Sequence, residues 1–263
     1  MNWNRMLSTG VILAYASAAW AQSPQPSATL GPSATLPITF TSTIHANRAR
    51  VGDVVLAKTT QPTQLANGET LPSGARVTGH VAQVDAFVFN KTPYARQTGS
   101  VLAVHFDSVS SKAATYPLNV YVRALADPVT SWDARKPRPS DDNGDGALTQ
   151  IGGELYKPHE GEIINMDEDV VGYSHHGNLV AHLIPAQGNS PDGCDGSDTE
   201  QPVSLFSANA CGLYGFSGTS LLSTGRSGQP STLVLTARRN DVVIWKNSTA
   251  LIETLPETQK NSN

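Results

Sequence analysis

Short runs of alternating apolar and polar residues, separated by turn signals, recur from Leu36 to Ala126. In the run SVLAVHFDSV, which begins at Ser100, the odd-numbered residues include His105 and Asp107 and share one face of an extended strand. The even-numbered residues, mostly apolar, share the other face. Asn-Gly and Pro-Ser-Gly sequences, which are typical of turns, separate such runs. Similar strand patterns occur again after residue 165. The pattern predicts a mostly β fold, an antiparallel barrel or sandwich.

The strand rhythm also predicts how the chain is organised. Residues 127–165 break it with prolines, glycines and a central acidic run, which predicts a long irregular loop excursion. The whole expected order is a signal peptide (1–21), a flexible Pro/Ser-rich leader (22–35), a first β half (36–126), the irregular acidic loop (127–165), a second β half with a disulfide (166–256) and a polar tail (257–263).

Residues 1–21 have the features of a secretory signal peptide. Arg5 precedes an apolar run from Met6 to Trp20, which is shorter than the roughly 20 residues that span a bilayer. Small residues at the first and third positions of the last triplet predict cleavage after Ala21. We therefore expect an exported protein, periplasmic or extracellular, with no transmembrane segment after cleavage.

Composition narrows the choice of partners. The formal net charge is −4 at pH 7, which gives no support for nucleic acid or an anionic membrane as partner. Only 15% of the residues are charged, whereas the chain holds 22 Gly and 17 Pro, a balance that favours many turns and few long helices.

Two cysteines, Cys194 and Cys211, both fall in the part expected to be exported. A metal site built on cysteine and histidine would normally need more thiols. In an oxidising compartment, an even number of cysteines favours a disulfide. We predict a Cys194–Cys211 bridge.

The segment Leu36–Val81 carries a resemblance to a known family. It contains R-V-G-D-V-V from Arg50 and, after a Gly, L-P-S-G-A-R-V-T-G from Leu71. This passage resembles the start of the β-barrel domain in TrbI-like scaffold proteins of bacterial conjugation and type IV secretion, and the resemblance reaches Leu125 if the later strands are included. It implies a non-enzymatic structural piece of a cell-envelope channel, with envelope proteins as partners. This chain differs in having a cleavable signal rather than an inner-membrane anchor.

The acidic loop offers one candidate cofactor site, for calcium. Asp141, Asn143 and Asp145 occupy positions 1, 3 and 5 of an EF-hand-type loop, and Gly146 occupies position 6. Position 12, which should supply a bidentate carboxylate, is Gly152. The alternative interpretation is a solvated turn without an ion.

Catalytic motifs are incomplete. The segment around Ser174 resembles the G-x-S-x-G nucleophile elbow of hydrolases, but His176 replaces the second glycine and no histidine follows His182. We assign no catalytic residue. The expected function is an exported, non-catalytic structural or binding component of the bacterial cell envelope. A secreted hydrolase with an unrecognised site and a calcium-stabilised adhesion or recognition module are the alternatives.

The disulfide has a measurable consequence. We expect reduction of the bridge to lower the free energy of unfolding by about 3 kcal/mol, because the bridge restricts the unfolded chain. Denaturant unfolding with and without reductant measures this change, and a Cys194→Ala/Cys211→Ala variant should match the reduced protein. Equal stability in both conditions would contradict the bridge.

Overall fold

The computed structural model describes residues 30–31, 33–92, 96–134, 148–149, 155–156, 161–164, 170–175, 178–183, 197–223, 225 and 229–255. Strands dominate these residues, so the prediction of a mostly β fold is confirmed. The elements are β1 (Thr35–Phe40), β2 (Ile44–His45), β3 (Val54–Thr59), β4 (Thr63–Gln64), β5 (Thr70–Leu71), β6 (Arg76–Asp85), β7 (Ser100–Ser110), β8 (Thr115–Pro117), β9 (Val120–Ala126), α1 (Pro128–Asp133), β10 (Leu148–Thr149), β11 (Leu155–Tyr156), β12 (Glu162–Ile164), β13 (Val170–His175), β14 (Asn178–Leu183), β15 (Ser197–Pro202), β16 (Gly212–Tyr214), β17 (Thr219–Ser223), β18 (Thr232–Ala237), β19 (Val243–Ile244) and β20 (Thr249–Thr254).

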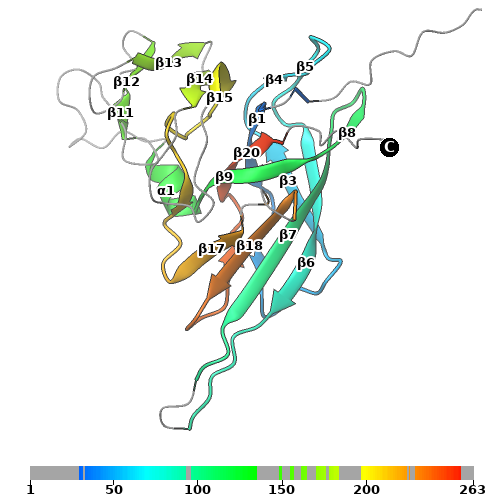
Figure 1. The fold of residues 1–263 in the computed structure, drawn as a ribbon, viewed down its shortest axis with the longest axis vertical. Coiled ribbons are helices and arrows are strands. Elements are labelled where there is room, and N and C mark those ends of the chain that lie inside the picture. The colour runs from blue at the N-terminus through cyan, green and yellow to red at the C-terminus, as the bar shows by residue number, and fades with distance from the viewer. Residues whose placement is uncertain are drawn as a thin grey trace, which may run out of the picture.

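The main sheet curls into a nearly closed barrel (Figure 1). Its strands follow the order β16-β9-β20-β1-β3-β6-β7-β18-β17, and β8 pairs with β7 beside this path. Neighbours are antiparallel except β16 and β9, which are parallel. The predicted β barrel is therefore present, and its otherwise antiparallel sheet contains one parallel pair. The physical reason is the long connection between β9 and β16, which returns the chain in the same direction.

Alternation places apolar side chains inside the barrel. In β7, Leu102, Val104 and Phe106 are buried, whereas His105 and Asp107 face outward and are partly exposed, as the sequence pattern predicts. The rings of Phe40 and Phe106 lie 6.5 Å apart, centroid to centroid, inside the barrel core. The barrel is therefore stabilised by a packed apolar interior.

A smaller lobe covers one side of the barrel (Figure 1). Its four-stranded sheet has the order β12-β13-β14-β15. Ile163, Leu183 and Phe206 of this lobe share a second apolar core with Ala124 and Leu251 of the barrel wall. Strands β1, β9 and β20 are consequently buried along their whole length, so that their polar residues, such as Arg123 and Glu253, are buried together with the apolar ones.

A buried arginine joins the barrel to the segment that follows the lobe. Arg123 of β9 is fully buried, and its Nε and Nη2 donate to the carbonyl oxygens of Ala210 at 3.1 Å and Ala208 at 3.3 Å. Its Nη1 lies 3.8 Å from Oε2 of Glu253, which also accepts a 2.6 Å hydrogen bond from the Tyr121 hydroxyl. The charge of Arg123 is thus compensated inside the protein.

The region expected to be irregular begins with a helix. Asp127 caps α1, because its side chain accepts a 2.7 Å hydrogen bond from the backbone N–H of Thr130, and Pro128 fits the first turn. The short strands β10, β11 and β12 also fall within residues 127–165. In the ranges given above, no helix is both long and apolar enough to cross a bilayer.

The hairpin of β6 and β7 projects beyond the barrel wall (Figure 1). Past the end of β6, Val88 and Thr98 exchange backbone hydrogen bonds of 3.1 and 3.4 Å. We call residues 86–92 and 96–99 the β6–β7 arm. The backbone N–H of Phe87 donates to Oδ1 of Asp241 at 2.7 Å, which ties the arm to the loop after β18.

Removing the buried arginine should be costly. We expect Arg123→Ala to lower the free energy of unfolding by about 3–5 kcal/mol, because it leaves the Glu253 carboxylate buried without its cation. Denaturant unfolding followed by circular dichroism measures the loss. Arg76→Ala removes an exposed arginine and serves as the control, with a change within about 0.5 kcal/mol. Similar losses in the two variants would show that Arg123 has no special role.

Candidate functional site

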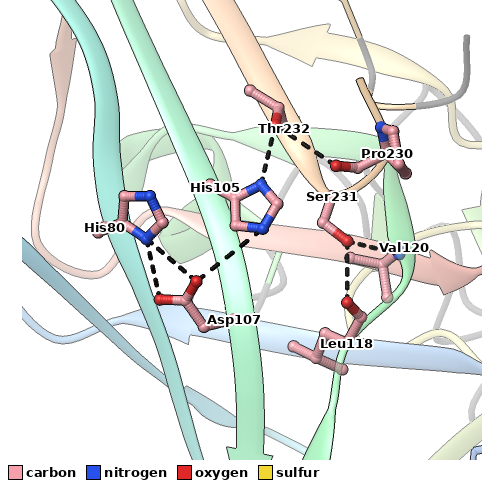
Figure 2. A network of polar contacts seen from close by, with 8 residues as sticks. All are labelled: His80, His105, Asp107, Leu118, Val120, Pro230, Ser231 and Thr232. Atoms are coloured by element: carbon pink, nitrogen blue, oxygen red, sulfur yellow. Dashed lines mark hydrogen bonds and ion pairs between the residues drawn. The ribbon is translucent and has the colours of Figure 1, made fainter. Parts of the chain in front are cut away.

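A polar network lies on the outer face of strands β6, β7 and β18 (Figure 2). The strand register places His80 opposite His105, and His105 opposite Thr232. Asp107 lies two residues beyond His105 on β7 and therefore on the same face. Three neighbouring strands thus bring two imidazoles, a carboxylate and a hydroxyl together.

The contacts in the network are unequal. His80 Nδ1 lies 3.0 Å from each carboxylate oxygen of Asp107. Because a carboxylate only accepts hydrogen bonds, Nδ1 of His80 carries the hydrogen in this contact. His105 Nε2 lies farther away, 3.9 Å from Asp107 Oδ1, and His105 Nδ1 lies 3.0 Å from Thr232 Oγ1. The carboxylate of Asp107 therefore interacts mainly with the imidazole of His80.

A glycine and two bulges bring the strands into this arrangement. The β6–β7 register shifts between Thr78 and Gly79 and again between Val81 and Gln83. A Cβ atom on Gly79 would collide with the carbonyl oxygen of His105. Glycine at this position lets β6 approach β7 closely, and the bulges set which side chains face each other.

The chain Thr232–His105–Asp107 has the order of a hydroxyl, an imidazole and a carboxylate, as in a nucleophilic relay. Such a relay needs the carboxylate within about 3.2 Å of the imidazole, whereas this separation is 3.9 Å. Thr232 is only 9% exposed, and its hydroxyl also lies 3.4 Å from the carbonyl oxygen of Pro230. The arrangement links three strands through their side chains, without the short carboxylate–imidazole contact of a formed relay.

Ser231, which precedes Thr232, has a separate structural role. Its hydroxyl donates to the carbonyl oxygen of Leu118 and accepts from the backbone N–H of Val120, both at 3.0 Å (Figure 2). Ser231 also adopts a positive φ of 61°. Its side chain joins the start of β18 to the approach to β9.

The residues predicted to hold calcium or a disulfide are mostly outside the described structure. Asp141, Asn143, Asp145 and Cys194 lie in the undescribed ranges. Cys211 is buried, and no cysteine of the described part is free. Both predictions remain predictions. Within the described ranges, no group of three or more His, Cys, Asp or Glu residues is arranged to hold a metal ion.

The hydrolase-like motif forms a hairpin. Ser174 lies in β13 opposite Leu179 of β14, so the strand–turn–helix geometry of a nucleophile elbow is not formed. His182 Nε2 lies 4.0 Å from Glu200 Oε1, and both side chains are exposed, as in an ordinary surface pair. His159 and His176 are outside the described residues.

Sequence reasoning identified His105 and Asp107 as sharing a face but did not assign them, or His80, to a site. Each lies at an outward position of an alternating strand, and that signal was available. These side chains come together only because of the β6–β7 register and its two bulges, which a single sequence does not reveal.

Comparisons with known proteins give no relative. No family model matches the chain, and no curated protein and no solved structure matches it. The resemblance of Leu36–Val81 to TrbI-like scaffold proteins therefore remains a prediction.

The network should contribute little to stability. We expect Asp107→Asn to lower the free energy of unfolding by less than about 1 kcal/mol, because His80 and Asp107 are partly exposed and solvent screens their interaction. NMR of the imidazole nitrogens should show a hydrogen on Nδ1 of neutral His80 in the wild type. Asp85→Asn, on the neighbouring strand β6, is the matched control. A loss of 3 kcal/mol or more (a factor of about 150) would contradict this role.

Proposed function

We propose that the protein is an exported, non-catalytic structural or binding component of the bacterial cell envelope, and that it contacts an envelope protein through the β6–β7 arm. The observation that carries this proposal is the exposure of apolar side chains on a projecting hairpin. Val88 is 58% exposed and Phe89 is 66% exposed. Aromatic side chains are enriched at protein interfaces, where they bury a large area.

The arm is held in place before any partner binds. Its base is tied to Asp241 through Phe87, and Gln97 accepts from the backbone N–H of Asn90 at 2.7 Å while donating to its carbonyl oxygen at 3.1 Å. A preformed hairpin loses less conformational freedom on binding than a loose loop. This order supports a contact role for the arm.

The rest of the described structure supports a structural role. Apolar side chains fill the barrel interior, and the polar network of His80, His105 and Asp107 lacks the geometry of a nucleophilic relay. The hydrolase alternative requires convergent catalytic groups, and the hairpin at Ser174 does not supply them.

Affinity purification from the native envelope tests the proposal. The tagged wild type should recover a reproducible set of envelope proteins, whereas a Val88→Ser/Phe89→Ser variant should lose them, because the apolar contact is removed. Val129→Ser, on helix α1, removes a valine of similar exposure (65%) and should retain the set. Recovery of the wild type as a clean monomer in the medium would overturn the proposal. An unchanged set with the double variant would overturn the role of the arm.

A further inference from the structure

A cavity of about 610 Å³ opens where β7 begins and β18 ends, next to the β6–β7 arm. Three arginines line it: Arg96 from the arm, and Arg238 and Arg239 from the turn after β18. Segments far apart in the sequence therefore supply three positive charges to one cavity. The chain as a whole is mildly acidic, so this concentration does not follow from a basic composition.

In the part of the chain that the structure describes, these arginines have no carboxylate partner within ion-pair distance. None of the three guanidinium groups forms an ion pair or a side-chain hydrogen bond in the described part of the chain. The neighbouring carboxylates have other partners. Asp241 accepts from the Phe87 backbone N–H at 2.7 Å and from Asn47 Nδ2 at 2.9 Å, and Asp85 accepts from Gln83 Nε2 at 3.1 Å.

Paired strands fix the floor of the cavity. Ser100 pairs with Ala237, and Val101 pairs with Thr236. A Cβ on Gly99 would lie 2.8 Å from the carbonyl oxygen of Ala237, so the backbones approach closely here. The arginines therefore extend from a well-defined base, and the partly exposed Thr236 beside them adds a hydroxyl.

We propose that this cavity binds a phosphate group. A guanidinium presents a planar fork of N–H donors that matches two oxygens of a phosphate, and several arginines around one anion strengthen this recognition. The cavity has a volume within the range of small-molecule sites, about 300–1,000 Å³. The phosphate can belong to a soluble molecule or to a lipid headgroup. This site shares Arg96 with the β6–β7 arm, but it does not rest on the envelope contact proposed for Val88 and Phe89.

Calorimetry with inorganic phosphate and with pyrophosphate, at low ionic strength, tests the site directly. The wild type should bind pyrophosphate more tightly than phosphate, and Arg96→Gln and Arg238→Gln/Arg239→Gln should each weaken binding at least tenfold. Arg76→Gln removes one positive charge at the far end of β6 and should bind as the wild type does. Thermal unfolding verifies that all variants remain folded.

Vesicles distinguish the two sources of the phosphate. Sedimentation with phosphatidic acid vesicles, but not with phosphatidylcholine vesicles, would support a lipid headgroup if pyrophosphate competes. Pyrophosphate binding without sedimentation would support a soluble ligand. The proposal is overturned if neither phosphate, pyrophosphate nor phosphatidic acid binds, or if the arginine variants bind as tightly as the Arg76→Gln control.

Discussion

The guanidinium of Arg123 connects the two parts of the molecule. A charge taken out of water is costly unless partners replace the lost solvent, and here the partners come from separate segments. Glu253 belongs to the last barrel strand, whereas Ala208 and Ala210 belong to the segment between the smaller lobe and β16. The compensation of this charge is complete only when β20 and the segment 208–210 are both in place. The buried charge therefore favours one relative arrangement of these parts over others.

Much of the barrel could be predicted from local sequence, because one face of each strand is buried. The alternation in β7 gave the correct inward residues. The strands of the smaller lobe are harder to predict from local sequence. The apolar residues Val203 and Phe206 lie just after strand β15 (Ser197–Pro202), and they are buried from a turn. Their apolar character reflects packing against the barrel, which periodicity does not detect. The parallel pairing of β16 likewise depends on a long connection.

The two clusters of functional interest depend on contacts that are distant in the sequence. His80 meets His105 and Asp107 through the β6–β7 register and its two bulges. Arg96 joins Arg238 and Arg239 because β7 pairs with β18. No spacing rule connects such residues, whereas the rejected motif around Ser174 was local and therefore visible. For this chain, local motifs were a poor guide to where polar groups converge.

The position of β1 affects how the chain can reach its native state. Thr35–Phe40 pairs on one side with β3, which follows closely, and on the other side with β20, near the opposite end of the chain. During synthesis β1 and β3 can associate early, but the second edge of β1 has no native partner until residues 249–254 have appeared. An apolar strand with an open edge readily pairs with the wrong segment or with another chain. Contacts of such long sequence separation also slow folding. The barrel can therefore close between β1 and β20 only late, after the last strand has been synthesised.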